Sequence, residues 1–116
     1  MLRVGISFFA LMLSAQVLGD VARFNTEITR IMVHGSLYGQ CMARVTQDIP
    51  SLLPNCNAGY VTFDCAADLP DTTRMNSSEK FNVAKTALVM GRPVFLEVID
   101  TQTINGFCLA NRIDMN

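Results

Sequence analysis

The sequence predicts a small, mainly β domain with one helix, in the order strand, strand, strand, helix, strand, strand. Three observations support this. The 116 residues leave room for one core. Five apolar runs have the alternation or β-branched composition of strands, and a single amphipathic segment lies between the third and fourth runs. A second domain and the large α/β folds of many cofactor enzymes are therefore excluded.

Residues 1–19 have the three parts of a secretory signal peptide: a basic start, a short apolar middle and a small residue at the end. We expect cleavage after Gly19, with Ala15 as an alternative, to leave residues 20–116 as a single domain. An uncleaved anchor or a first helix of the domain is the other interpretation. No later stretch has the length of a membrane span, so the sequence predicts a secreted or periplasmic protein.

Four cysteines follow the predicted cleavage site: Cys41, Cys56, Cys65 and Cys108. An even number in a short exported chain predicts two disulfides, with reactive thiols as the alternative. No Cys-x-x-Cys motif occurs and His34 is the only histidine, so no metal site is expected. Three pairings remain possible from the count alone.

The first two strands are expected at residues 26–33 and 40–46, after a leader arm at 20–25. Apolar residues change parity within 26–33, which predicts a bulge. The glycine-containing segment 34–39 predicts a hairpin. In the second strand Cys41, Ala43 and Val45 share a dry face, which leaves Met42 and its neighbours on a wet one.

The third strand is expected at residues 60–65, between loops at 47–59 and 66–75 that contain proline and asparagine. Asn76 with Glu79 predicts a capped helix start, and Gly91 followed by Pro93 predicts its end. The fourth strand, 94–99, is apolar on both parities. Asn105-Gly106 predicts a tight turn into the fifth strand, 107–115, where Phe107 and Leu109 face one way and Cys108 and Ala110 the other.

This order matches the five-stranded barrel of the oligonucleotide/oligosaccharide-binding (OB) fold; an open α+β sheet with the helix on one face is the alternative. In the barrel the second and third strands are antiparallel neighbours, which places Cys41 beside Cys65. The fifth strand runs parallel to the third, which places Cys108 near Cys56. We therefore favour the bridges Cys41–Cys65 and Cys56–Cys108.

Residues 81–98, with the sequence FNVAKTALVMGRPVFLEV, form an amphipathic helix that ends at glycine and leads directly into a strand. This segment resembles the B subunits of pertussis-type and subtilase-type AB5 toxins. The resemblance covers 18 residues and implies an exported OB-fold subunit that forms rings and binds glycans. The run from Asn105 to Asp114 also resembles the C-terminal ends of small exported bacterial proteins, a group that implies no activity.

The sequence offers few parts for catalysis. His34 is the one base near neutral pH, and its glycine turn indicates a solvated side chain. The irregular spacing of Asp64, Asp68 and Asp71 matches no calcium loop. Arg112 and Asp114 share a strand face, which indicates a surface ion pair. We expect no enzyme activity and no cofactor.

Tyr38 and Tyr60 are the candidate ligand-binding residues, because a phenol ring with a polar tip suits sugars and protein interfaces. A net charge of -1, which becomes -2 after loss of residues 1–19, argues against nucleic acid. The sequence therefore predicts an exported, non-enzymatic binding module, a possible homo-oligomer that forms a ring and binds a glycan or a receptor. The alternative is a monomeric periplasmic accessory or inhibitor protein that binds a protein partner through the 47–59 loop.

Overall fold

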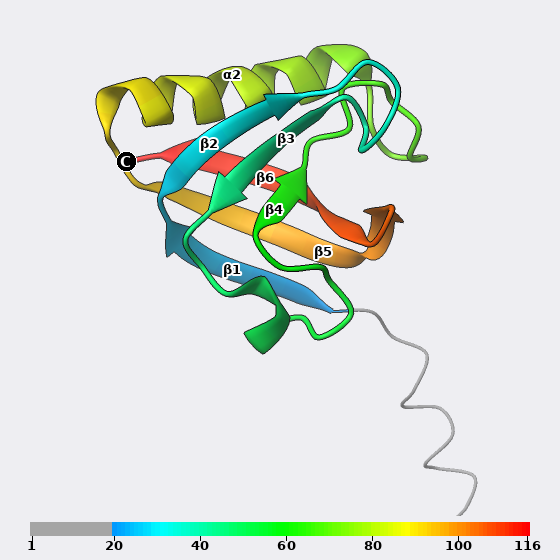
Figure 1. Cartoon of the computed structure of the whole chain (residues 1–116), viewed down its shortest axis with the longest axis horizontal. Helices are drawn as coiled ribbons and strands as arrows, with labels where there is room; N and C mark the ends of the chain where they lie inside the picture. Colours follow the sequence, from blue (N-terminus) through cyan, green and yellow to red (C-terminus); the bar gives the residue numbers. More distant parts are fainter. Residues whose placement is uncertain (1–19) are drawn as a thin grey trace, which may run out of the picture.

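The computed structural model describes residues 20–116, so the predicted signal peptide lies outside the described residues (Figure 1). The fold is mainly β with one α-helix. Its elements are β1 (Val21–Thr26), β2 (Ile28–Val33), β3 (Cys41–Val45), the short 3-10 helix η1 (Ile49–Ser51), β4 (Tyr60–Thr62), α2 (Arg74–Met90), β5 (Val94–Ile104) and β6 (Phe107–Met115).

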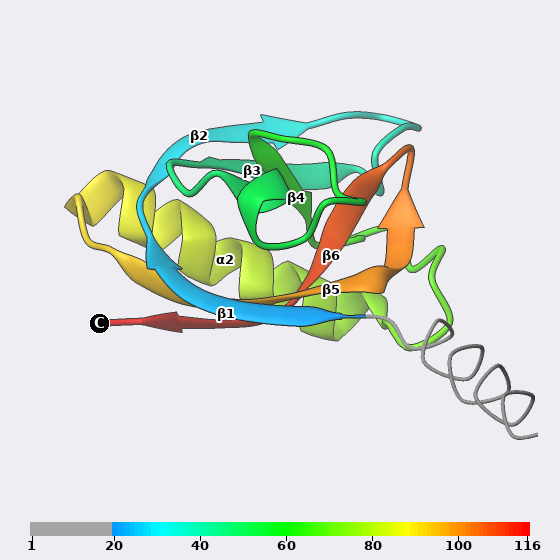
Figure 2. The ribbon, with the colours of Figure 1, turned by 90° about the horizontal axis from the view of Figure 1, so that it is seen from below.

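All six strands belong to one mixed sheet with the order β1-β5-β6-β4-β3-β2. Neighbouring strands are antiparallel except β4 and β6, which pair in parallel at Thr62 and Leu109. The predicted five-stranded barrel is wrong, because β1 and β2 at the two ends of the sheet do not pair. The sheet is open, as in the alternative arrangement, but it curls, and the chain passes directly from β1 into β2 (Figure 2).

The leader arm predicted at residues 20–25 is also wrong, since this segment is strand β1. Phe24 and Thr26 are buried, and the whole strand pairs with β5. Thr26 fixes the bend into β2: its hydroxyl lies 3.1 Å from the Thr46 hydroxyl and accepts the Gln47 amide at 3.0 Å. The predicted bulge is confirmed by a register shift between Ile28 and Arg30.

One apolar core fills the inside of the curl, and two segments close its ends. Helix α2 contributes Phe81, Ala84 and Ala87 at one end. The 47–59 segment with η1 lies at the other (Figure 1), where it buries Ile49 and Leu53. The long loop is therefore part of the core, which explains how a chain of this size encloses its apolar side chains.

Helix α2 begins before the residue that the sequence indicated. Its N-cap is Thr73, whose hydroxyl accepts the Asn76 amide at 3.2 Å, so the predicted cap at Asn76 is wrong. Either residue type is a good cap, so the residue preference alone does not decide between the two starts. Gly91 ends the helix as predicted, with a φ of 67° that favours glycine.

The structure contains the bridges Cys41–Cys65 and Cys56–Cys108, the pairing that the strand arrangement favoured. The antiparallel pairing of β3 with β4 and the parallel pairing of β4 with β6 produce this proximity. The first bridge ties the start of β3 to the segment after β4. The second ties the 47–59 loop to β6.

Strands β5 and β6 form a long hairpin. The Asn105-Gly106 turn is present, with φ angles of 52° and 84°. Strand β5 continues to Ile104, beyond its predicted end at Ile99. A register shift opposite Glu97 and Val98 switches the faces of β6. Ile113, expected on the side of Phe107 and Leu109, therefore faces the core with Cys108 and Ala110.

Candidate functional site

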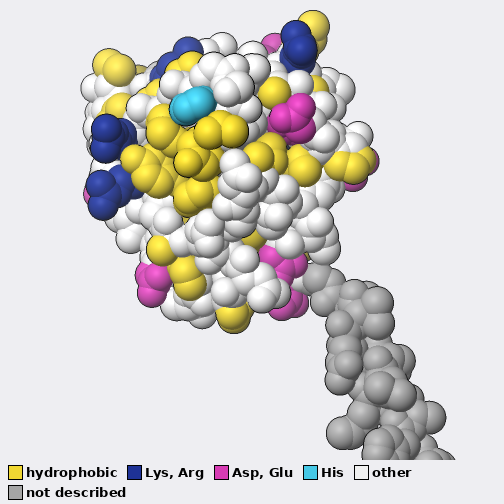
Figure 3. Space-filling model, turned by 45° about the vertical axis from the view of Figure 1, so that its right-hand side comes forward, with side chains coloured by type: hydrophobic (Ala, Val, Ile, Leu, Met, Phe, Trp, Pro, Cys, Tyr) yellow, Lys and Arg dark blue, Asp and Glu magenta, His cyan; other side chains and the backbone are white. Residues whose placement is uncertain are grey.

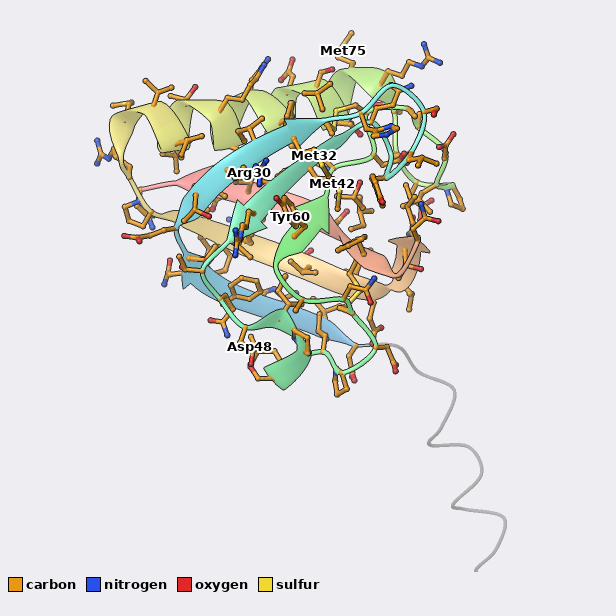
Figure 4. All side chains as sticks on the ribbon, in the orientation of Figure 1. Arg30, Met32, Met42, Asp48, Tyr60 and Met75 are labelled. Carbon is orange, nitrogen blue, oxygen red and sulfur yellow. A yellow bond between two sulfur atoms is a disulfide. The ribbon has the colours of Figure 1, made fainter. Side chains whose placement is uncertain are left out.

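The outer face of β2, β3 and β4 carries two rows of side chains that the strand register sets across the sheet. In the first row Arg30 is opposite Arg44, and Arg44 is opposite Tyr60. In the second row Met32 is opposite Met42, and Met42 is opposite Thr62. Figure 4 shows Arg30, Met32, Met42 and Tyr60 on this side of the sheet. The row that contains the two arginines therefore lies next to the row that contains the two methionines.

Met42 contradicts the prediction that its face of β3 is wet, because it is only 1% exposed. Thr62 and Leu109 are buried on the same side, and neither Met42 nor Leu109 belongs to the main core cluster. The sheet therefore has a second, small apolar layer outside the curl. The sequence pattern missed it because alternation shows which residues share a face and not what covers that face.

Both candidate tyrosines lie at this layer, and Phe107 of β6 connects them. The Phe107 ring is 5.7 Å from the Tyr38 ring and 6.4 Å from the Tyr60 ring, each edge to face. His34 adds a fourth ring, 5.7 Å from Tyr38. Figure 3 shows hydrophobic side chains gathered beside the single histidine, with basic side chains at the margin.

We call this surface the tyrosine face. Its members are Arg30, Met32, His34, Tyr38, Met42, Arg44, Tyr60 and Phe107. Sequence reasoning missed Phe107, since only the parallel pairing of β4 with β6 brings it between the tyrosines. It also missed the arginines, although Arg44 shares a strand face with Met42 and could have been found from that alternation.

The backbone that presents Tyr38 is strained. Tyr38, Gly39 and Gln40 have φ angles of 60°, 73° and 74°, a conformation that is unusual for a bulky residue such as tyrosine. Thr62 stabilises it by donating a hydrogen bond from its hydroxyl to the Tyr38 carbonyl at 2.9 Å. Gly39 is required here, because a Cβ atom would lie 2.7 Å from Thr62 Oγ1 and 2.9 Å from the Asp64 backbone.

His34 holds the same loop in place, and its side chain is half-buried beside the glycine turn. Its Nδ1 accepts the backbone amides of Ser36 and Leu37 at 3.1 and 3.0 Å. Its own amide donates to the Gln40 carbonyl at 2.9 Å, which closes the loop. With one ring nitrogen bound to the turn, His34 acts as a support for Tyr38.

The charges of the tyrosine face lack partners within the described residues. The ion pairs found in residues 20–116 are Arg23–Glu97 at 2.9 Å and Arg112–Asp114 at 2.7 Å, and neither includes Arg30 or Arg44. Both of these arginines are exposed. Like charges directly opposite each other on neighbouring strands destabilise a sheet. The row therefore has a cost in stability that no ion pair of residues 20–116 offsets.

The outer face of β1, β5 and β6 has the opposite arrangement. There Glu97 lies opposite both Arg23 and Arg112 in the register. Asn111 donates to Glu97 at 2.9 Å, and this hydrogen bond, together with the Arg23 guanidinium, lowers the pKa of Glu97 although partial burial opposes the shift. Arg112 also forms the ion pair with Asp114 that the sequence indicated. We call this surface the paired face.

Two of the three aspartates after β4 accept hydrogen bonds within the described residues. The Asp64 carboxylate is fully buried and accepts the Asp68 and Leu69 amides and the Thr72 hydroxyl, at 3.0, 2.8 and 2.6 Å. Asp71 accepts a hydrogen bond from Gln102. Across residues 20–116 no three His, Cys, Asp or Glu side chains are grouped so that they could hold a metal ion.

Helix α2 carries a shallow depression of about 250 Å³ lined by Lys85, Thr86, Val89 and Met90. All four residues come from one helix surface, so no second element forms an opposing wall. Small-molecule sites are usually enclosed between elements and carry convergent polar groups. The depression is therefore a weaker candidate than the tyrosine face.

No protein-family model, curated protein or solved structure matches this chain. Within residues 20–116, α2 is not apolar enough to cross a bilayer.

Proposed function

We propose that this protein is an exported, non-enzymatic binding module that recognises a glycan through the tyrosine face. The observation that carries the proposal is the chain of edge-to-face rings in which Phe107 joins Tyr38 to Tyr60. The half-buried aromatic rings and Met32 offer apolar area, and the phenol groups offer hydrogen bonds at its edge. This combination suits the faces of sugar rings.

The strained loop supports the same assignment. A left-handed conformation at a residue such as tyrosine costs on the order of 1 kcal/mol, and such strain is concentrated at ligand sites. Here it coincides with a candidate ligand residue that Thr62 and His34 hold in position. The cost is consistent with a function that needs the Tyr38 ring in this orientation.

Export is supported by the two disulfides, which persist in extracellular and periplasmic proteins and are rare in the cytosol. A binding role is favoured over catalysis because Nδ1 of His34 is occupied by two backbone amides. The Asp64 carboxylate is likewise occupied by its own loop.

A glycan array probed with the protein recovered from the periplasm or culture medium tests the proposal. We expect saturable binding to a defined set of glycans, and Tyr60→Ala should weaken it at least tenfold while Tyr60→Phe keeps most of it, since stacking needs the ring. Val89→Ala on the exposed side of α2 is the matched control. Failure to bind any glycan, or equal losses in Tyr60→Ala and Val89→Ala, contradicts the proposal.

The rival role, protein binding through the 47–59 loop, has less support. Ile49 and Leu53 point into the core, and among the leucine and isoleucine side chains of this loop only Leu52 is exposed, at 44%. Light scattering distinguishes a ring, which would present several tyrosine faces together, from a monomer. Capture of a partner protein that is lost in Leu52→Asp and retained in Tyr60→Ala would favour the rival.

A further inference from the structure

We infer that the tyrosine face selects an anionic glycan, with Arg30 and Arg44 together binding its carboxylate or sulfate group beside Tyr60. The inference rests on the proposed function and names the ligand class. It follows from the row Arg30–Arg44–Tyr60 that the register sets across β2, β3 and β4.

The paired face shows how the same sheet arranges arginines when a carboxylate lies between them. Across β1, β5 and β6 the register reads Arg23–Glu97–Arg112, with one carboxylate between two arginines. The tyrosine face has two adjacent arginines and no carboxylate among the ion pairs of residues 20–116. The chain has 10 acidic residues for 9 basic ones, so carboxylates are not scarce. A bound anion would place a negative charge between Arg30 and Arg44, as Glu97 does between Arg23 and Arg112.

The geometry suits a single small anion. Side chains that are directly opposite on neighbouring antiparallel strands have Cβ atoms about 5 Å apart, so two guanidinium groups can reach the same carboxylate or sulfate. Guanidinium groups bind such groups through paired N–H donors, and these charge-assisted hydrogen bonds are stronger than neutral ones. Tyr60 continues the row, and the half-buried Met32 lies in the next row, so the body of the ligand beside the anion meets aromatic and apolar surface.

The experiment compares three matched glycan sets on one array: neutral glycans, the same cores with a uronic acid carboxylate, and the same cores with a sulfate. We expect the wild-type protein to bind one or both anionic sets at least tenfold more strongly than the neutral set, with affinity that falls as salt rises. The uronic acid and sulfate arms identify which anion is used. Equal binding of neutral and anionic cores would overturn the inference while the proposed function stands; no glycan binding would remove both.

Variants then locate the anion. Arg30→Gln and Arg44→Gln should each lower the affinity for the anionic glycan at least tenfold, and Arg44→Lys should recover part of it, because the charge remains but the planar fork is lost. Arg112→Gln is the control, because it removes the same charge from the paired face. Melting temperature checks folding: a loss of binding with an unchanged or raised melting temperature supports the inference, and unchanged binding in both glutamine variants overturns the assignment.

Discussion

The two outer faces of the curled sheet both carry a pair of arginines, but only one face has a carboxylate between them. On the paired face Arg23 and Arg112 flank Glu97, Asn111 donates to the same carboxylate, and the row is satisfied internally. On the tyrosine face Arg30 and Arg44 are opposite each other beside half-buried aromatic rings and a strained loop. The first face contributes to stability. The second gives up stability, and such local cost is typical of a binding surface.

Removal of a disulfide should have the largest effect on the stability of the protein. The bridges close segments with sequence separations of 24 and 52 residues. The chain-entropy model assigns them about 3 and about 4 kcal/mol of unfolding free energy. Urea unfolding of Cys41→Ala/Cys65→Ala and Cys56→Ala/Cys108→Ala measures both losses.

Only the first pair holds the start of β3, which carries Met42 and Arg44. Cys41→Ala/Cys65→Ala should therefore weaken ligand binding more than Cys56→Ala/Cys108→Ala, although it costs less stability. The reverse order for binding would show that the tyrosine face does not depend on this bridge.

Gly39→Ala should have the next largest effect, about 2 kcal/mol or more of unfolding free energy, because the new Cβ atom clashes with Thr62 and the backbone is left-handed. Gly35→Ala is a close control: it lies in the same loop, with nothing within 4 Å of the added atom. Denaturant unfolding compares them. Equal stabilities would mean that Tyr38 is not held as the structure indicates.

Charge removal should then change stability in opposite directions on the two faces. Arg23→Gln should lower the unfolding free energy by about 0.5 kcal/mol, since it breaks a partly exposed ion pair. Arg44→Gln should raise it by a few tenths of a kcal/mol, since it relieves the opposed arginines. Thermal melts at low salt, where surface charges are least screened, measure both; a decrease of the same size in both variants would remove the contrast between the faces.

The smallest effect concerns pH. The pKa of Glu97 is lowered in the folded protein, so its charged form contributes stability above the ordinary value of 4.5, and the contribution is lost as the pH falls through the folded pKa. Glu97→Gln should cost less than about 1 kcal/mol at pH 7, because Arg23 is 59% exposed. The difference from wild type should shrink below pH 4.5. A difference that persists in acid would mean that Glu97 acts through packing.

The parts that followed from the sequence depend on short-range patterns. Alternation at Cys41, Ala43 and Val45 located β3, the parity change located the bulge in β2, and Gly91 located the end of α2. The disulfide pairing followed from the expected strand neighbours. Local patterns of this kind are strong because each is set by residues a few positions apart.

The predictions that were wrong concern residues whose structure depends on segments far away in the chain. Residues 20–25 look like a polar arm, and they become β1 only because β5 provides a pairing edge. Met42 looks exposed, but it is buried beside Thr62, whose hydroxyl binds the carbonyl of Tyr38 in the 34–39 loop. Thr73 and not Asn76 is the helix cap, and its hydroxyl accepts the Asn76 amide.

The sequence by itself determined five of the strands, the helix and the two tyrosines as ligand candidates, because composition and short spacings specify these features. The disulfide pairs followed from the expected order of neighbouring strands. Only the tertiary structure decided that the sheet is open and curled, that Phe107 joins the tyrosines, and that Arg30 is opposite Arg44 while Glu97 separates Arg23 from Arg112. Those features depend on register between strands far apart in the chain. A single bulge or bend changes which side chains meet, and no local pattern encodes that choice.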